Sequence, residues 1–367
     1  MTLITTLLML GRKKTGIKKC PCQPVFDVTI GDIPGIKEAD PRYVDLSFLA
    51  AHDANTGRAE RGAPLEECAS KILFSVEPLI RNYLYRYVKT QTETIYDILR
   101  FGCRFLHIKV TYYKGKWFTS HSVLTGELET HILDVLRFLS ERREDGEIVT
   151  LLFQPIFFGD KSFADLHDFL AEIRYNGKNI FDYVFYSPVS EFGKGDGVKV
   201  GDLRYGDVTG GDGKTGVVLF QRRDQHCLPS WDARKSSYPY FFDMDENSLH
   251  VWHDLSRIGK LDREIDLLCD KILSSDRYKD MLRLNQTQPS SCYKTFGDAL
   301  CSIYSRSLLK TAERHNVRLI EKLDLNKMLK AMPVFQVDYV TSGCGDFNGR
   351  INRAIRIFNE SLVSSLL

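Results

Sequence analysis

The sequence predicts an α/β fold in which parallel strands alternate with helices and form a (β/α) barrel with long loops at its rim. The first observation is a series of short apolar runs rich in β-branched residues, as expected for buried strands. The second is that the segments between these runs carry apolar residues at helical spacing. Because no glycine-rich dinucleotide-binding loop follows the first strand, a barrel is favoured over an open doubly wound sheet.

The predicted elements alternate from residue 48 towards the end of the chain. We expect strands at 48–52, 103–110, 147–154, 217–221, 281–286, 317–323 and 334–340. We expect helices within 66–100, near 128–143, and at 161–174, 261–275 and 297–315. The segment 187–248, rich in glycine, aspartate, serine and aromatic residues, is predicted as long loops around one strand. Seven or eight strands in this order predict a single barrel domain, residues 44–367, after an N-terminal extension, residues 1–43.

Composition places the chain among ordinary globular proteins. It has 367 residues, of which 43% are hydrophobic and 27% charged, enough for a large core. The 50 basic and 48 acidic residues leave a formal charge of +2, so we expect no nucleic-acid partner. The nine scattered cysteines favour a reducing compartment, and the lone pair Cys20 and Cys22 is weak evidence for zinc. The apolar start, MTLITTLLML, is too short to span a bilayer and lacks the basic residues of a signal peptide. A soluble or peripheral membrane protein, with the cytoplasm favoured, is therefore predicted.

Ionisable and amide side chains collect where the predicted strands end, which is where parallel barrels carry their catalytic residues. These side chains are His52, Asp53, His107, Lys109, His121, Gln154, Arg222 and Asp338. Two histidines and two carboxylates are suited to acid and base catalysis, because a carboxylate fixes the tautomer of each imidazole and supports its charged form. Taken alone, a histidine at a strand end, such as His52 or His121, is more often a hydrogen-bonded structural residue than a catalyst, and Asp338 is compatible with a cap. These residues by themselves therefore leave the reaction open.

The order of several motifs resembles the catalytic domain of phosphatidylinositol-specific phospholipase C, in particular the single-domain bacterial type. The motifs are HDANTG, GCRFLHIKV, His121 about a dozen residues later, VVLFQRR before a long aromatic loop, and VFQVDYV followed by a final helix, RINRAIRIFNESL. The similarity covers roughly residues 44–362. It implies a distorted TIM-type (β/α)8 barrel and cleavage of the bond between phosphate and diacylglycerol by the inositol 2-hydroxyl.

The resemblance also implies roles for individual residues. His52 would be the general base, supported by Asp338, and His121 the general acid, supported by Asp53. Lys109 stands where the metal-independent bacterial enzymes have an arginine that contacts phosphate. Substrate-binding positions of the family match, in this sequence, Arg222, Gln154, His107 and, more loosely, His253 with Leu255.

Three of these positions depart from the family pattern. His107 replaces an acidic residue, Lys109 replaces an arginine or a second acidic residue, and Gln154 replaces a lysine. Because calcium prefers carboxylate ligands and a lysine repels a cation, we expect no calcium, no other metal and no cofactor. Lysine lacks the planar fork of arginine, so weaker stabilisation of the transition state is expected.

A lipid substrate requires the barrel rim to reach a membrane. Two aromatic stretches are candidates for this contact: Tyr112, Tyr113, Lys114, Lys116, Trp117 and Phe118 in the first, and Tyr238, Tyr240, Phe241 and Phe242 in the second. Rings interleaved with lysines suit the headgroup level of a bilayer. The same residues would equally serve to cover the barrel mouth.

Three hypotheses follow from the sequence. The first is a metal-independent, monomeric phosphodiesterase that acts on phosphatidylinositol or its glycosylated form at a membrane surface. The second is a catalytically weak or inactive module that binds the lipid headgroup, motivated by the three replaced residues. The third, a metal-dependent glycerophosphodiesterase, ranks last because no acidic ligand pair appears at the strand ends.

Overall fold

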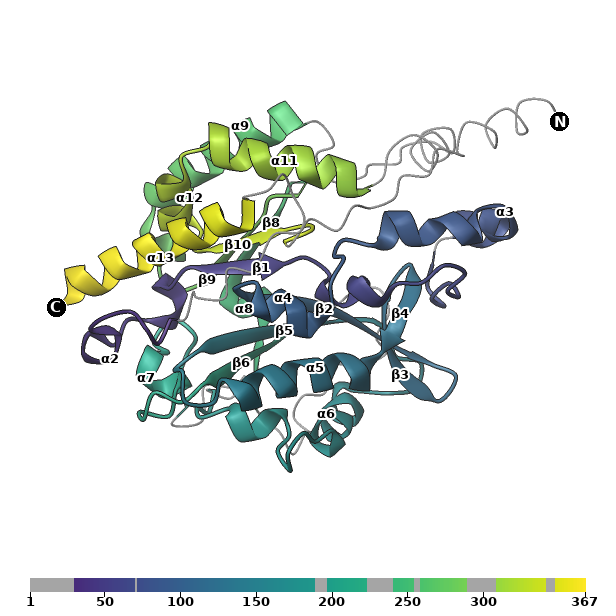
Figure 1. Cartoon of the computed structure of the whole chain (residues 1–367), viewed down its shortest axis with the longest axis horizontal. Helices are drawn as coiled ribbons and strands as arrows, with labels where there is room; N and C mark the ends of the chain where they lie inside the picture. The colour runs from purple at the N-terminus through teal and green to yellow at the C-terminus, as the bar shows by residue number, and fades with distance from the viewer. Residues whose placement is uncertain are drawn as a thin grey trace.

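The structure is a computed structural model that describes residues 30–69, 71–188, 197–222, 240–253, 258–288, 308–340 and 347–367. Its centre is a curled sheet with eight strands in parallel order (Figure 1). From edge to edge these are β7 (Phe241–Asp243), β6 (Gly216–Gln221), β5 (Ile148–Phe157), β2 (Cys103–Tyr113), β1 (Phe48–Ala51), β10 (Val334–Val337), β9 (Leu282–Gln286) and β8 (Ser248–Trp252). Among the described residues no ladder joins β7 to β8, so the barrel is open along this side. The predicted distorted parallel barrel is confirmed.

Helices cover the outside of this sheet. In Figure 1, α5 (Leu128–Glu141) and α6 (Phe163–Glu172) lie on one side, and α9 (Ile258–Leu273), α11 (Leu308–Lys322), α12 (Leu325–Ala331) and α13 (Phe347–Leu366) lie on the other. The remaining long elements are α3 (Lys71–Val88) and α4 (Ile95–Arg100). Short elements complete the chain: α2 (Ile36–Ala39), η1 (Tyr43–Asp45), η2 (Ala54–Arg58), η3 (Ile180–Tyr183), α7 (Tyr205–Val208), α8 (Met244–Asn247) and η5 (Asp276–Tyr278).

Local sequence signals explain where several helices begin. Thr94 accepts a hydrogen bond from the backbone N–H of Asp97 at the start of α4, and Asp324 accepts one from that of Lys327 at the start of α12. Ser162 and Asp165 form a reciprocal capping box at the start of α6. Each cap satisfies a donor that the first helical turn would otherwise leave unpaired, and such a cap is typically worth about 1 kcal/mol.

Alternation of side chains along the strands separates two apolar clusters and positions the polar residues. The outer cluster beneath the helices includes Leu49 and Leu106, whereas the inner cluster includes Ala50, Phe105 and Leu152. Because successive strand residues point to opposite faces, the inner rows continue into polar side chains at the carboxyl ends of the strands. The inner positions reached in this way are His52, His107, Lys109, Gln154, His250, Gln286 and Asp338.

The amino-terminal end of the barrel is filled and held together by residues outside the central strands. Ile30, Ile33 and Ile36, which the sequence places in the N-terminal extension, are buried in the inner cluster. Buried Arg104 donates two hydrogen bonds to Glu147, at 2.6 and 2.9 Å, and is thereby fixed at the amino ends of β2 and β5, opposite the carboxyl ends that carry the candidate site residues. The arginine of GCRFLHIKV is therefore a structural residue.

Several predicted elements are corrected by the structure. Of residues 317–323, predicted as a strand, all but the last belong to α11, where the apolar residues follow helical periodicity and Leu319 is buried. Segment 187–248 contains β6, β7, α7 and α8 and leads into β8, so it is more ordered than loops around one strand. The start of the predicted helix 297–315 lies outside the described residues up to 307.

A hairpin that the sequence analysis treated as a short connection also belongs to the sheet. Strands β3 (Lys116–His121) and β4 (Val123–Glu127) extend it antiparallel to β2, with Val110 opposite Thr119. His121 is therefore the last residue of an antiparallel strand and not part of a loop after a parallel one.

Candidate active site

Asp53 is the central residue of the candidate site. Strand β1 ends at Ala51, and two residues later the backbone of Asp53 adopts a left-handed conformation with φ of 43°. Aspartate tolerates this conformation better than most residues do. The turn is held by Thr56, whose hydroxyl donates to the carbonyl of Asp53 at 2.9 Å. As a result the carboxylate is completely buried below the carboxyl ends of β1 and β2.

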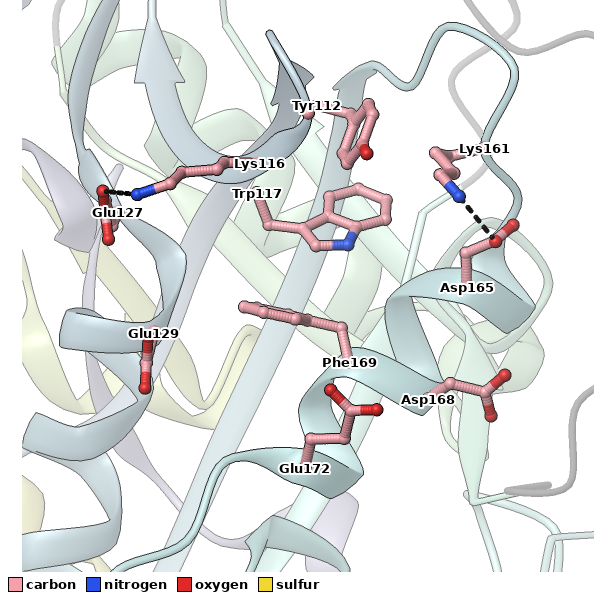
Figure 2. Close-up of a pocket in the computed structure, with 11 residues that line it drawn as sticks. Tyr112, Lys116, Trp117, Glu127, Glu129, Lys161, Asp165, Asp168, Phe169 and Glu172 are labelled. Carbon is pink, nitrogen blue, oxygen red and sulfur yellow. Dashed lines mark hydrogen bonds and ion pairs between the residues drawn. The ribbon is translucent and has the colours of Figure 1, made fainter.

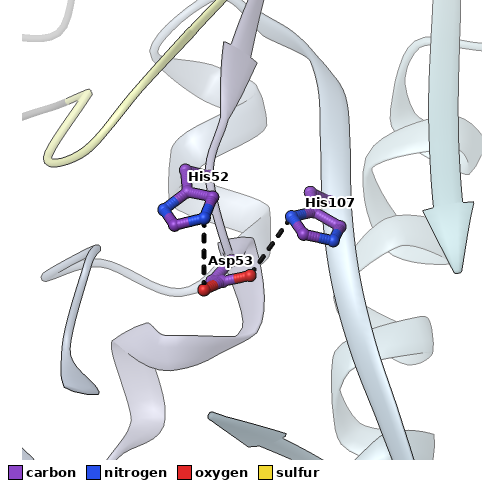
Figure 3. A group of neighbouring side chains, drawn as sticks. All are labelled: His52, Asp53 and His107. Carbon is purple, nitrogen blue, oxygen red and sulfur yellow. Dashed lines mark ion pairs between the residues drawn. The ribbon is translucent and has the colours of Figure 1, made fainter. Parts of the chain in front are cut away.

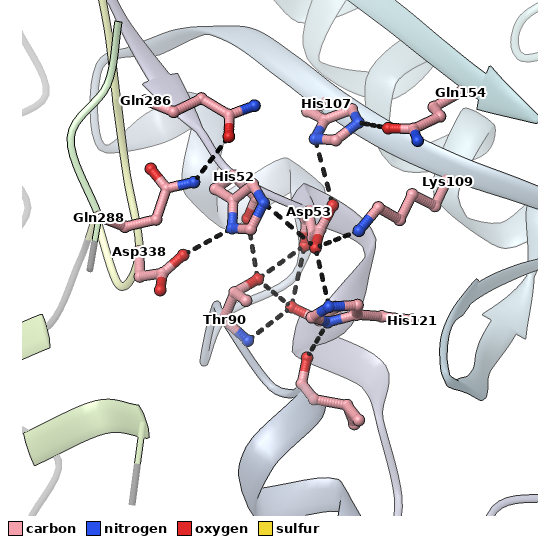
Figure 4. Close-up of polar contacts among 12 residues, drawn as sticks. His52, Asp53, Thr90, His107, Lys109, His121, Gln154, Gln286, Gln288 and Asp338 are labelled. Carbon is pink, nitrogen blue, oxygen red and sulfur yellow. Dashed lines mark hydrogen bonds and ion pairs between the residues drawn. The ribbon is translucent and has the colours of Figure 1, made fainter. Parts of the chain in front are cut away.

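Four basic side chains surround the Asp53 carboxylate (Figures 3 and 4). Oδ2 lies 3.0 Å from Lys109 Nζ, 3.3 Å from His121 Nε2 and 3.4 Å from His52 Nε2. Oδ1 lies 3.1 Å from His107 Nδ1. Burial alone would raise the pKa of Asp53, but its basic neighbours, led by His52 and Lys109, hold it well below the usual range. Asp53 is therefore ionised.

His52 contacts a second carboxylate. Its Nδ1 lies 2.8 Å from Asp338 Oδ1. Burial would lower the pKa of His52, but Asp53 and Asp338 together raise it above its ordinary value. Thr90 and Gln91 hold the backbone of His52, since both donate to its carbonyl, at 2.8 and 3.0 Å. The imidazole is therefore fixed with Nε2 towards the centre of the site.

His121 is oriented by the backbone of α3. Its Nδ1 donates to the carbonyl of Val88 at 2.7 Å, so Nε2 faces Asp53. Burial and the nearby Lys109 ammonium lower the pKa of His121 to about 4. In the ligand-free site this imidazole is neutral at physiological pH.

Lys109 is positioned through its backbone by a buried asparagine. Asn55 Oδ1 accepts from the backbone N–H of Lys109 at 3.1 Å, and Asn55 Nδ2 donates to the Ser120 carbonyl and the Thr125 hydroxyl at 3.2 and 2.8 Å. One side chain thus joins β2 to the β3–β4 hairpin that carries His121. This role of Asn55 was not predicted from the sequence, although Asn55 lies within the motif HDANTG.

The structure brings one further predicted residue, Gln154, into the site beside His107. His107 Nε2 lies 2.7 Å from Gln154 Oε1, and burial lowers the pKa of His107 well below its ordinary range despite Asp53. Arg222 follows β6 and is about one-third exposed, with Nε 3.5 Å from Asp245 Oδ1.

His253 is not brought together with the other predicted residues. It hydrogen bonds Asn285 at 3.0 Å, on the outer face of β9. The inner position on β8 belongs instead to His250, which the sequence analysis missed and which contacts Gln286. Gln288, equally buried, donates to Gln286 at 3.2 Å (Figure 4). The signal for His250 was available, because strict alternation within SLHVW predicts Ser248, His250 and Trp252 on one face.

The first aromatic stretch forms a hairpin that lines a pocket outside the barrel, and only its turn, residues 114–116, is exposed. The cavity has a volume of about 390 Å³ and lies between the β2–β3 hairpin and α6. Figure 2 shows Tyr112, Trp117 and Phe169 among its walls. Trp117 is only 6% exposed and packs edge-on against Phe158, so its ring is not available for the membrane contact that was one of the two roles considered for this stretch. Phe242 in the second stretch is also buried, and Tyr238 lies outside the described residues.

A different aromatic residue is exposed at the mouth of the barrel. Trp252, at the carboxyl end of β8, is 61% exposed. Within the described residues, no helix has the length and apolar character needed to cross a bilayer.

Comparison with known proteins supports the resemblance read from the sequence. No family model matches the chain. A PI-PLC X-box domain-containing protein from Dictyostelium discoideum is 27% identical over 203 residues, which is 51% of this chain and 25% of that protein. The chain therefore matches about a quarter of that relative's length.

Solved structures decide the fold. A variant of phosphatidylinositol-specific phospholipase C from Staphylococcus aureus superposes with a TM-score of 0.56 and 15% identity, over 90% of this chain and 99% of that one. The Listeria monocytogenes enzyme superposes with a TM-score of 0.51 and 14% identity, over 89% and 99% of the two chains. The chain has the fold of the bacterial phosphatidylinositol-specific phospholipases C. The resemblance to phosphatidylinositol-specific phospholipase C is thus confirmed at the level of the fold.

Proposed function

We propose that this protein is a phosphodiesterase of the phosphatidylinositol-specific phospholipase C type. The inositol 2-hydroxyl attacks the neighbouring phosphorus, the bond to the diacylglycerol oxygen breaks, and a cyclic inositol phosphate and diacylglycerol are released. One observation carries the proposal: two histidines, each beside a carboxylate, converge with Lys109 at the carboxyl end of a barrel of this fold.

His52 is the proposed general base. With Nδ1–H donating to Asp338, its neutral ring offers the Nε2 lone pair to the 2-hydroxyl proton. The imidazolium that forms lies between Asp338 and Asp53, and their charges stabilise it. The raised pKa of His52 follows from the same two carboxylates and makes the ring a stronger base.

His121 is the proposed general acid that protonates the leaving diacylglycerol oxygen. It needs a proton on Nε2 for this role, and its pKa of about 4 in the free site disfavours that proton. A bound phosphodiester carries a negative charge that offsets Lys109 and raises the pKa of the imidazole. Substrate binding thus prepares the acid, and Asp53 then supports the imidazolium.

Lys109 supplies the positive charge for the phosphorane-like transition state. Its ammonium, 3.0 Å from Asp53, lies in the interior beside both histidines. A fixed lysine next to Asp53 opposes a hard cation such as calcium, which supports a reaction without metal. An ammonium cannot bind two phosphate oxygens with the planar, bidentate geometry of a guanidinium, so we expect weaker stabilisation of the transition state and slow turnover.

The headgroup is proposed to bind between the two edges of the open barrel. Gln154 and Arg222 on one side face His250 with Gln286 on the other, and these donors suit inositol hydroxyls. Trp252 at the mouth is suited to the headgroup level of a bilayer. A peripheral, monomeric protein without nucleic-acid partners remains our prediction.

The function is tested with purified protein and phosphatidylinositol vesicles in the presence of a chelator. Release of inositol cyclic phosphate that disappears in His52→Ala supports the proposal. If neither protein forms product, the proposal is wrong.

The second candidate is a module that binds the lipid headgroup without turnover, favoured by Lys109 in place of arginine and by the low pKa of His121. It predicts that vesicle binding persists in a His52→Ala, His121→Ala double variant, and that the unmodified protein forms no product.

A further inference from the structure

His107 and Asp53 form a buried pair whose facing atoms make no hydrogen bond. Asp53 is fully buried and His107 is 2% exposed. Within the described part of the chain, neither Asp53 Oδ1 nor His107 Nδ1 has a hydrogen-bond partner, although they lie 3.1 Å apart. Gln154 Oε1 lies 2.7 Å from His107 Nε2 and accepts a hydrogen bond from it. The single proton of the neutral ring is therefore on Nε2, and Nδ1 carries a lone pair. The Nδ1 lone pair of His107 then faces the buried Asp53 carboxylate, an arrangement that a cation would satisfy.

His52 adds a third donor to this pair (Figure 3). Its Nε2 lies 3.4 Å from Asp53 Oδ2, and one donor atom from each of His52, Asp53 and His107 lies within 4.8 Å of the other two. A tetrahedral metal with bonds of about 2.0–2.2 Å needs ligand atoms about 3.3–3.6 Å apart. Small side-chain movements would therefore complete a three-ligand site.

The donor set determines which metal fits. Two imidazole nitrogens and one carboxylate oxygen suit zinc and its neighbours in the first transition row, and they do not suit calcium or magnesium. Three protein ligands also leave a fourth position open for water or a phosphate oxygen. We propose that His52, Asp53 and His107 bind Zn²⁺, and that the bound ion inhibits the enzyme.

Inhibition follows from the atoms that the metal occupies. The ion takes the Nε2 lone pair of His52, the atom proposed to accept the 2-hydroxyl proton, and it also takes the charge of Asp53. This consequence rests on the proposed function, whereas metal binding does not. His107 is the ligand that distinguishes the site, because it brings a nitrogen donor where the family pattern has a carboxylate.

Lys109 limits the affinity. Its ammonium lies 3.0 Å from Asp53 Oδ2, so it competes with the metal for the carboxylate and repels it by charge. Removal of this charge should strengthen metal binding, whereas removal of His107 should weaken it. A merely structural perturbation would not move affinity in these two opposite directions.

The test uses the whole 367-residue chain, freed of metal by dialysis, and titrates it with Co²⁺ as a visible probe that Zn²⁺ displaces. Even partners outside the first ligand shell change metal affinity by about 10- to 100-fold, so His107→Ala should weaken binding by at least about tenfold. Lys109→Met should strengthen it by a similar factor. Two controls should match the unmodified protein: His253→Ala, and a Cys20→Ser, Cys22→Ser variant that removes the other metal-binding candidate of the sequence.

The outcomes separate metal binding from activity. Saturable Co²⁺ absorption at one ion per chain, lost on Zn²⁺ addition and shifted oppositely by the two variants, supports the site even if no lipid is cleaved. The proposed site is overturned if neither the unmodified protein nor Lys109→Met shows saturable Co²⁺ absorption. It is also overturned if the Co²⁺ titration of His107→Ala is the same as that of the unmodified protein. If His107→Ala does not fold, Lys109→Met decides, and unchanged or weaker binding overturns the proposal. For an active enzyme, Zn²⁺ should reduce product release, and inhibition that is equal in His107→Ala would overturn the inhibitory role.

Discussion

Replacement of Asp53 by asparagine tests how charge is balanced in the site. Asp53→Asn keeps the shape of the side chain but removes the negative charge beside Lys109. At about pH 7.5, His107 and His121 are neutral because burial lowers the pKa of each, so the unpaired charge is chiefly the ammonium. The variant therefore measures what it costs to leave this ammonium in the interior.

The magnitude follows from the distance. Unit charges 3.0 Å apart attract by about 5 kcal/mol at an effective dielectric constant of about 20. Loss of one partner from a buried pair usually costs about 3–5 kcal/mol. Because the Lys109 side chain is 16% exposed and regains some hydration, we expect the free energy of unfolding to fall by about 3 kcal/mol.

A double variant separates stability from catalysis. Asp53→Asn with Lys109→Met no longer buries an unpaired charge, so most of the lost stability should return. Activity should not return, because both residues belong to the proposed catalytic machinery. General acid–base catalysis contributes a rate factor of about 10²–10⁴, and the double variant should lose a factor of this size. Asp145→Asn, which breaks a partly exposed pair with Arg142 at 2.9 Å, is the control and should cost less than about 1 kcal/mol.

The assay is urea unfolding followed by tryptophan fluorescence, together with product release from phosphatidylinositol vesicles. An Asp53→Asn variant as stable as the Asp145→Asn control would refute the reasoning. So would a double variant that is no more stable than Asp53→Asn alone.

Three further predictions use other parts of the structure. Because His52 must be neutral to act as base, kcat/KM should fall as pH drops through its raised pKa, and Asp338→Asn should move this acid limb to lower pH; an unmoved limb contradicts the pairing. Trp252→Ala should reduce binding to phosphatidylinositol vesicles by roughly tenfold and affect a water-soluble short-chain substrate far less; equal loss on both substrates contradicts membrane contact. The free energy of unfolding should decline from about pH 6.5 towards pH 4, because histidines in the unfolded chain gain protons over this range. Buried histidines with a pKa of about 3 or 4 stay neutral in the folded protein, and each should lower the free energy of unfolding by about 1 kcal/mol per pH unit. These are His121, His131, His167, His250 and His315, and a flat melting temperature over this range contradicts their burial as neutral rings.

The order of the barrel strands could be predicted because each buried strand leaves a local mark. The apolar run FLAA predicts a strand, and His52, the next residue, is the polar side chain that follows it. The same holds for the run VFQV and the residue that follows it, Asp338. Asp338 lies 286 residues from His52 along the chain, and the parallel pairing of β1 with β10 brings the two side chains together. Parallel pairing of neighbours thus converts two local signals into one long-range contact.

Features that depend on tertiary context escaped the sequence. Residues 317–323 are apolar and β-branched enough to suggest a strand, yet a long amphipathic helix buries Leu319. The convergence of four basic side chains on Asp53 requires its left-handed backbone and the β3–β4 hairpin, and neither has a pattern of its own. The lysines close to Trp117 in the sequence suggest an exposed side chain, but in the structure its ring packs against Phe158.

The central claim, that His121 protonates the leaving group while His52 deprotonates the attacking hydroxyl, is tested most directly by changing the leaving group. The measurement compares kcat/KM for phosphatidylinositol with that for an inositol phosphate ester of a nitrophenol, which leaves without protonation. We predict that His121→Ala loses at least about hundredfold on the lipid but less than about tenfold on the activated ester, whereas His52→Ala loses at least about hundredfold on both. Equal losses in His121→Ala on the two substrates would contradict the account.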